Sequence, residues 1–444
     1  MKSPSRSACL VLLIFALSSA PRAFAQATKK PPKAPAAPAK VEPPQDPLQL
    51  LLKQADEAIN KNDYAAALTP LQSYIAQRPD DAAAHFQLGY AYTGLERADD
   101  AKAEYQKATE LNPKLTAAHI NLGLLLLDRD PAAAAQSFRR AAELLPDRAR
   151  PQFLLGQALE RSKNLPAAIA AYEEAGRLDP KDFEVRFALG RIMLQRERFV
   201  EAEARFREAL AIKPDAARAQ LGLAEALMVQ KKYEPSAAAF AVYLAAMPDD
   251  KASHHENASV LLELGKYDEA LAELDRADAG TKPSLASIEL RADIHLRQRQ
   301  WPEAEGVLQK AIQQFPENAA LHARLGRVLL AKREFAPAEQ ELRRALQIDS
   351  SGIEAQRDLV AVYYLGKNFP AALDALDRLE MREPPSTGAW FVRATCYDKL
   401  GKKPEAIAAY QKFLDLDKNP ERDDQHWQAQ QRILALTHEL QRKR

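Results

Sequence analysis

The chain has 444 residues, with 62 lysines and arginines against 61 aspartates and glutamates. This balance argues against nucleic acid as the main partner, because nucleic-acid-binding surfaces carry an excess of basic residues. The two cysteines, Cys9 and Cys396, are too few for a disulfide-rich scaffold.

Residues 1–25 have the three parts of a secretory signal peptide. Lys2 and Arg6 form a basic start, an apolar run extends from Cys9 to Leu17, and Ala23-Phe24-Ala25 is a small-x-small cleavage site. The apolar run is too short to span a membrane. We therefore expect export with cleavage of the signal, and a retained anchor is the alternative.

Residues 26–47 form a linker rich in proline, alanine and lysine. They include seven prolines and four lysines but no aromatic residue. Such a segment cannot bury enough apolar surface to fold and favours an extended, polyproline-like chain. We expect a disordered spacer, and contact of its lysines with an anionic envelope surface is the alternative.

Residues 48–420 repeat one pattern eleven times, with a period of 34 residues except for one step of 33. A bulky apolar residue stands four positions after a small one, which places both on the same face of a helix. Proline follows that helix in most units and ends it. The small residues are Ala67, Ala101, Ala134, Ala168, Ala202, Ser236, Ala270, Ala304, Ala338, Ala372 and Ala406.

An earlier helix in each unit carries a recurring Leu-Gly pair, as in Leu88-Gly89 and Leu155-Gly156. Glycine costs a helix interior about 1 kcal/mol relative to alanine, so its recurrence indicates close packing. We expect the alanine of the following helix to cross directly over this glycine. Each unit is then a pair of antiparallel helices that buries one face on the next unit.

These columns resemble the tetratricopeptide repeat (TPR) family, and with the signal peptide they resemble its secreted, cell-envelope type. The second repeat shows the signature best, with His85, Leu88, Gly89, Tyr92, Ala101, Tyr105, Ala108 and Pro113. The resemblance covers about 84% of the chain. It implies an all-α, right-handed α-solenoid of about eleven helix pairs, with a groove lined by the first helix of each pair. It implies no reaction.

Residues 421–444 are predicted to form a single helix with Ala429, Ile433, Leu436 and Leu440 on one stripe. The terminal unit of a repeat stack must cover the apolar face of its neighbour. We therefore expect this helix to cap the last repeat.

Residues suited to catalysis or cofactor binding are scarce in the repeats. There is no glycine-rich phosphate loop after a strand pattern. Four of the eight histidines share the fourth repeat position and are expected to replace the tryptophan usual there: His85, His119, His254 and His322. Cys396 is expected to be a buried, apolar residue. We expect no enzymatic activity, catalytic residue, cofactor or metal site.

By family analogy, the second, fifth, sixth, ninth and twelfth positions of each first helix line the groove. Partly exposed aromatic rings beside polar groups suit a peptide or a glycan. The alternative is that these rings belong to the core. The candidate partner-binding residues, all in repeats two to five, are Phe86, Tyr90, Asn121, Arg150, Phe153, Gln157, Phe187 and Arg191.

Charges along the groove predict ion pairs between successive repeats. Arg150, Glu184 and Arg218 alternate in sign at one groove position, and Arg191 and Glu225 do so at another. Exposed pairs of this kind contribute about 0–1 kcal/mol each.

The sequence thus predicts a non-catalytic scaffold or adaptor in the bacterial periplasm or cell envelope, with protein or peptide partners bound in its groove. Resemblance to envelope repeat proteins implies secretion, polysaccharide-export or outer-membrane machinery as the setting. The alternative is a periplasmic peptide- or glycan-binding protein that acts alone. We expect no transmembrane segment after signal cleavage.

Overall fold

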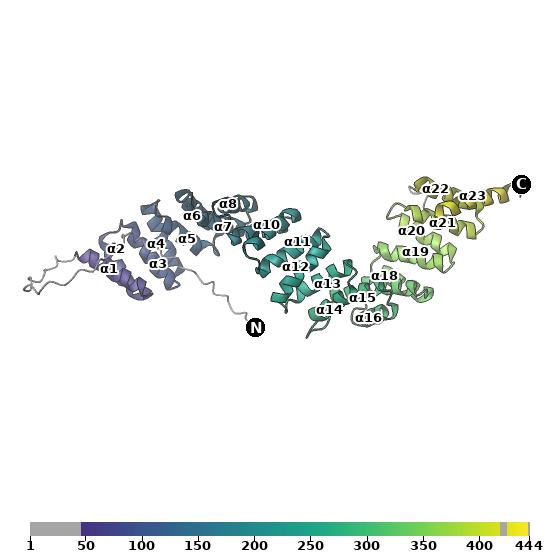
Figure 1. Ribbon diagram of the computed structural model, residues 1–444, viewed down its shortest axis with the longest axis horizontal. Coiled ribbons are helices and arrows are strands. Elements are labelled where there is room, and N and C mark those ends of the chain that lie inside the picture. The colour runs from purple at the N-terminus through teal and green to yellow at the C-terminus, as the bar shows by residue number, and fades with distance from the viewer. Residues whose placement is uncertain (1–45, 418–423, 443–444) are drawn as a thin grey trace, which may run out of the picture. The chain divides into compact units, whose positions relative to one another are not determined.

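The computed structural model describes residues 46–417 and 424–442, and this part of the chain contains 23 α-helices and no β-strand. The predicted signal peptide, residues 1–25, and nearly all of the predicted linker, residues 26–47, lie outside the described residues. Figure 1 shows the helices in chain order. The all-α solenoid expected from the repeats is confirmed.

The helices alternate between the first and second members of each pair. The first twelve are α1 (Pro47–Asn60), α2 (Tyr64–Gln77), α3 (Ala82–Gly94), α4 (Ala98–Leu111), α5 (Thr116–Leu126), α6 (Pro131–Leu144), α7 (Ala149–Arg161), α8 (Leu165–Leu178), α9 (Phe183–Gln195), α10 (Phe199–Ile212), α11 (Ala217–Val229) and α12 (Tyr233–Ala246). They are followed by α13 (Lys251–Glu263), α14 (Tyr267–Ala277), α15 (Leu285–Arg297), α16 (Trp301–Gln314), α17 (Ala319–Ala331), α18 (Phe335–Ile348), α19 (Ile353–Leu365), α20 (Phe369–Glu380), α21 (Thr387–Lys399), α22 (Lys403–Leu416) and α23 (Asp424–Gln441).

The chain divides into two compact units, one ending at Pro79 and the other beginning at Asp80. In the first unit, α1 packs on α2. In the second, each odd-numbered helix from α3 to α21 packs on the helix that follows it, and each pair packs on the next. The last helix, α23, packs on α22 and buries Ala429 and Leu436, as expected for a cap.

The turn inside most pairs holds one residue in the left-handed region of backbone conformation. Lys163, between α7 and α8, has φ +62°, and Glu197 and Lys231 repeat this at 34-residue steps. Repeat three is one residue short at this turn, and its Asp130 has φ −142° and caps α6 instead. The irregular spacing in the sequence therefore changes one turn and leaves the helix pair intact.

The recurring glycines are close-packed as predicted, and the atoms nearest to them belong to the bulky residue of the second helix rather than to the alanine side chain. A Cβ added to Gly156 would lie 2.7 Å from the Tyr172 ring, and one added to Gly89 would lie 2.8 Å from the Tyr105 ring. The bulky residue four positions after the alanine fills this space. The small residues of the alanine column, such as Ala101 and Ala168, are themselves completely buried.

Histidines at the fourth repeat position are polar links between helices. His322 Nδ1 lies 2.6 Å from the Glu341 carboxylate, and its Nε2 lies 2.9 Å from the Pro316 carbonyl oxygen. His254 contacts Glu273 and the Pro248 carbonyl in the same way. Because a carbonyl oxygen only accepts, Nε2–H must be the donor in the contact with the proline carbonyl. The contact between Nδ1 and the carboxylate then needs a second proton, either on Nδ1 or on the carboxyl group.

Charge pairs between successive first helices form only in part as predicted. Arg218 pairs with Glu184 one repeat before it, whereas Arg191 pairs with Glu160 and not with Glu225. Glu225 has no ion pair in the described part of the chain. Burial raises its pKa, and the nearby Glu256 carboxylate raises it further.

Substituting Gly156 by alanine should destabilise the fold, because the new Cβ would overlap the Tyr172 ring. Overpacking of this kind costs about 1–3 kcal/mol. Thermal or urea unfolding of the purified chain would measure the change.

Gly306→Ala is the matched control. Gly306 lies inside α16, and nothing stands within 4 Å of an added Cβ. Alanine should therefore stabilise this helix by about 1 kcal/mol. Equal effects of the two substitutions would contradict the packing role of Gly156.

Glu225→Gln should raise the melting temperature at pH 7. Burial and the Glu256 charge raise the pKa of the Glu225 carboxyl, so the folded state binds its proton more tightly than the unfolded state does. The stability associated with this proton is present below the ordinary carboxyl pKa of about 4.3 and is lost as the pH rises through the folded-state value. The gain from glutamine should therefore disappear near pH 4.

The control for this substitution is Glu173→Gln, which removes an exposed carboxylate from α8. Melting curves of both variants at pH 7 and pH 4 would separate the local effect from the change in net charge. A lower melting temperature for Glu225→Gln at pH 7 would contradict the repulsion between the two carboxylates.

Candidate functional site

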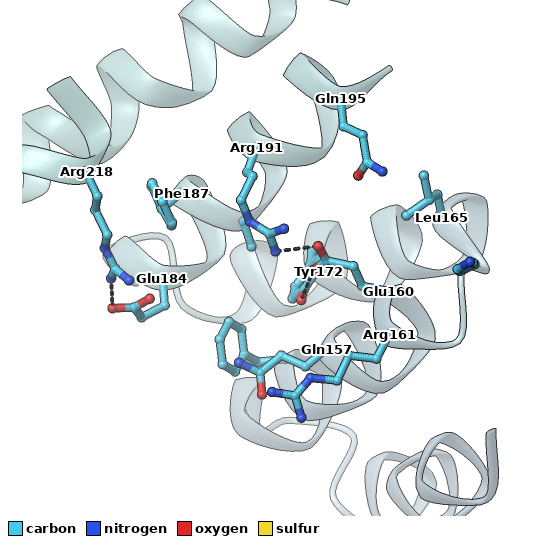
Figure 2. Close-up of a pocket in the computed structure, with 13 residues that line it drawn as sticks. Gln157, Glu160, Arg161, Leu165, Tyr172, Glu184, Phe187, Arg191, Gln195 and Arg218 are labelled. Carbon is cyan, nitrogen blue, oxygen red and sulfur yellow. Dashed lines mark hydrogen bonds and ion pairs between the residues drawn. The ribbon is translucent and has the colours of Figure 1, made fainter. Parts of the chain in front are cut away.

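A pocket of about 870 Å³ opens on the faces of α7, α9 and α11, and we call it the α7–α9 pocket. Its lining comes from first helices, from the turn after α7, and from the start and middle of α8 (Figure 2). The lining residues are Phe153, Gln157, Glu160, Arg161, Lys163, Leu165, Tyr172, Glu184, Phe187, Ala188, Arg191, Gln195 and Arg218.

Aromatic rings form the floor of this pocket. Phe153 is only 5% exposed, and its ring lies 5.7 Å from that of Tyr172, centroid to centroid. Phe187 is half-buried and stacks on Phe183 at 5.9 Å. The floor is therefore continuous with the core, and Phe187 is the ring that a ligand can reach most directly.

A hydrogen-bonded network fixes one wall. The Tyr172 hydroxyl donates to the Glu160 carboxylate at 3.0 Å, and Arg191 forms an ion pair with the same carboxylate. Figure 2 shows Arg191 of α9 reaching across to Glu160 of α7. Burial raises the pKa of Tyr172, and the negative charge of Glu160 raises it further, so the tyrosine stays protonated and donates.

A second ion pair closes the other wall. Arg218 of α11 pairs with Glu184 of α9, and its guanidinium carbon stands 4.4 Å from the centre of the Phe187 ring. A cation over an aromatic face is attracted by the electrons of the ring. Arg218, Glu184 and Phe187 therefore lie close together in the lining of the pocket (Figure 2).

Polar groups without an internal partner remain at the pocket. Within the described residues, the side chains of Gln157 and Gln195 form no hydrogen bond, and Lys163 forms no ion pair. Four basic and two acidic side chains line the pocket, which gives it a formal excess of two positive charges. The arrangement can accept an apolar group on the rings and hydrogen-bond acceptors or a carboxylate at the rim.

Half of the predicted groove residues come together here. Phe153, Gln157, Phe187 and Arg191 line the pocket. Arg150 is not a lining residue, but its guanidinium carbon lies 5.7 Å from the centre of the Phe153 ring.

The other predicted residues lie around Tyr105, at α3 to α5. Phe86 and Tyr90 are half-buried, and the Phe86 ring lies 5.9 Å from the Tyr105 ring. The Asn121 side-chain amide donates to the Tyr105 hydroxyl at 3.4 Å. The structure does not place these residues in the α7–α9 pocket.

Sequence reasoning missed several lining residues. Glu160 occupies the twelfth position, which the family analogy includes in the groove, so that signal was present in the sequence. Tyr172 belongs to the bulky column, and this position in the repeat predicts a packing role alone. Lys163 and Gln195 lie at or near the ends of first helices, where repeat position does not predict which way a side chain points.

The described residues contain no group of three or more His, Cys, Asp or Glu side chains that could hold a metal ion. Cys396 is buried, and burial raises the pKa of its thiol to about 11, so it is protonated at neutral pH. None of the helices within 46–417 and 424–442 combines the length and apolarity of a membrane-crossing segment.

Among known proteins, part of the chain is similar to the protein SGT1 homolog of Bos taurus, with 32% identity over 95 residues. This alignment spans 21% of the present chain and 28% of that relative.

Three solved structures illustrate the similarity in fold. Yeast Tom70 is 15% identical, with 89% of this chain and 96% of that chain covered and a TM-score of 0.40. YrrB, described as a TPR protein with an unusual peptide-binding site, is 19% identical, with 44% and 97% covered and a TM-score of 0.37. MamA from Desulfovibrio magneticus RS-1 is 21% identical, with 39% and 98% covered and a TM-score of 0.36.

Three family models, each described as tetratricopeptide repeat, match the chain directly. One matches residues 52–116, 123–183 and 290–353, a second matches 193–256, and a third matches 388–420. Together they cover about two thirds of the sequence. The chain belongs to the tetratricopeptide repeat family.

Proposed function

We propose that this protein is a non-catalytic interaction scaffold of the bacterial periplasm or cell envelope, and that its α7–α9 pocket binds a peptide segment of a partner protein. The repeat fold is consistent with protein–protein interaction. The observation that carries the proposal is the combination of an aromatic floor with the amides of Gln157 and Gln195, which have no hydrogen bond within the described residues.

The chemistry of the pocket favours a particular kind of peptide. Phe187 and the edge of Phe153 offer apolar surface for one side chain. The two glutamine amides suit the carbonyl and N–H groups of an extended backbone. Lys163 and Arg161 add positive charge at the rim, and the Arg161 guanidinium already pairs with Asp128 at 2.7 Å. We therefore infer a segment with an apolar residue followed or preceded by an acidic one.

The envelope location is supported by the sequence of the first 25 residues. A basic start, a short apolar run and a small-x-small site are what the secretion machinery recognises. A repeat scaffold there would assemble secretion, polysaccharide-export or outer-membrane machinery.

Export can be tested with a reporter. Residues 1–47 fused to an enzyme that is active only after disulfide formation should give activity in intact bacteria, because disulfides form in the periplasm and not in the cytosol. The matched control lacks residues 9–17, the apolar run. Equal activity of the two fusions, or none from the intact segment, would contradict export.

Partner binding can be tested by site-specific photocrosslinking. A photoreactive residue at Gln195, which is exposed at the pocket, should form an adduct with a protein partner in cells, and mass spectrometry should identify the linked peptide. The same residue at Gln340, exposed on α18 and outside the pocket, should not form this adduct. Adducts only with a glycan would support the alternative of a binding protein that acts alone.

The linked peptide then allows a quantitative test. Gln157→Ala combined with Gln195→Ala should weaken its binding about tenfold, since two hydrogen-bonding groups are lost at about 0.5–1.5 kcal/mol each. The melting temperature should stay near that of the wild type, because neither amide is bonded internally among the described residues. Unchanged affinity in this double variant would contradict the assignment of the pocket.

A further inference from the structure

A second cavity, of about 500 Å³, lies between α12 and α14, and we call it the α12–α14 cleft. Its base is the first helix α13, which contributes Asn257 and Leu261. Alanines of α12 and α14 form its walls, and charged residues surround its mouth. It shares no lining residue with the α7–α9 pocket.

Asn257 is a buried polar residue in a position that is apolar in most other repeats. Seven other repeats have a buried leucine there: Leu88, Leu122, Leu155, Leu189, Leu223, Leu325 and Leu359. Asn257 is only 5% exposed, and its Oδ1 atom has no hydrogen-bond partner in the described part of the chain. A buried carboxamide without a partner is unusual, because its transfer from water is unfavourable unless hydrogen bonds replace those lost.

Three other repeats also have a polar residue at this position. Gln54 is exposed, whereas Arg291 and Arg393 have partners supplied by the preceding repeat. Arg291 pairs with Asp275 at 2.9 Å and with Asp278 at 3.3 Å. Arg393 likewise pairs with Asp377 at 2.7 Å and with Glu380 at 2.6 Å. In each case both carboxylates come from the second helix of the repeat before or from its C-cap residue, Asp278.

The junction that holds Asn257 lacks such partners. The repeat positions of Asp275 and Asp278 are occupied there by Ala241 and Leu244, both on α12. The alanine leaves space where another junction has a carboxylate, and Ala241 lines the cleft. The carboxylates that hold the arginines at the two other junctions are therefore absent here, and Asn257 and Ala241 line the same cleft.

The chemistry of the cleft selects a peptide group as the complement of Asn257. A carboxamide has an acceptor at Oδ1 and donors at Nδ2, and a peptide N–H and C=O match both. Ala237, Ala238 and Ala272 give apolar walls, which suit small side chains and offer no hydrogen bonds to the many hydroxyls of a glycan. The backbone of a bound peptide can approach Asn257 closely only where the side chain of the peptide residue is small.

The charges at the mouth indicate what flanks the contact. Lys266 pairs with Glu269 at 3.5 Å, and Arg276 pairs with Glu273, which His254 also contacts. Glu234 lines the cleft without an ion pair among the described residues. One negative charge at the mouth is thus uncompensated, and it favours a lysine or arginine on the ligand.

We propose that the α12–α14 cleft is a second, independent binding site, which takes an extended peptide segment with a small residue at its centre and a basic residue beside it. The peptide N–H donates to Asn257 Oδ1, and the basic side chain pairs with Glu234. This inference does not depend on the proposed function of the α7–α9 pocket.

The test uses the full chain and an array of synthetic seven-residue peptides. Their central residue is alanine or phenylalanine, and the neighbouring residue is lysine or glutamate. Peptides with a central alanine and a neighbouring lysine should bind the protein on the array. Fluorescence anisotropy should then measure the affinity of the peptide that binds most strongly. Asn257→Leu should weaken it at least tenfold and melt at or above the wild-type temperature, because it restores the leucine of seven other repeats.

A second variant narrows the cleft without changing Asn257. Ala241 is exposed on α12, and Ala241→Leu should also weaken the peptide at least tenfold. Gln157→Ala combined with Gln195→Ala should leave the affinity unchanged, since both residues line the other pocket. When the peptide is bound, hydrogen exchange of the backbone amides should slow in residues 234–241 and 266–276 of the protein.

Three results would overturn the proposal. The first is an affinity that Asn257→Leu and Ala241→Leu leave unchanged. The second is slowed exchange in α7 to α9 and not at the cleft, which would place the peptide in the other pocket. The third is an array in which no peptide is retained, which would mean that the cleft binds no peptide of this kind.

Discussion

In the cleanest repeats, a bulky side chain of the second helix fills the space that a glycine leaves on the first. Tyr105 does so at Gly89, and Tyr172 does so at Gly156. This contact sets how closely the two helices of a pair approach, and the completely buried alanines of the second helix complete the seam. The candidate site depends on it directly, because the ring that packs on Gly156 also carries the hydroxyl that holds Glu160 in the wall of the pocket.

Much of the fold could be predicted from the sequence because the 34-residue period repeats the same arrangement of packed residues in each unit. The period located the small column, and the apolar stripe in 421–444 predicted the cap, but neither could show which side chain lies nearest to the glycine. Alanine and ring lie on one helix face, four residues apart, and only their three-dimensional positions show which of them is nearer to the glycine. The pocket was predicted less well. Phe153 and Arg191 follow repeat positions, whereas Lys163 and Gln195 take their directions from a turn and a helix end.

Polar residues in a packed column also show how the repeats depend on their neighbours. Arg393 is only 7% exposed, yet it is tolerated because the preceding helix provides Asp377 and Glu380. The pairing is a property of two repeats together, and neither repeat alone predicts it. Asn257 stands at the same position with Ala241 and Leu244 before it, so the compensation is missing at this junction. Nearest-neighbour packing of this kind lets one junction change while the others keep their structure.

The two candidate sites differ in the sign of their charge, and this difference limits what one partner can do. The α7–α9 pocket is lined by four basic and two acidic residues, whereas the α12–α14 cleft is lined by two basic and three acidic residues. A short segment suited to one site would therefore meet like charge at the other, which disfavours binding there. A partner that engages both would need two chemically distinct segments. Joining them in one chain would make the second contact intramolecular and would strengthen capture without any new contact.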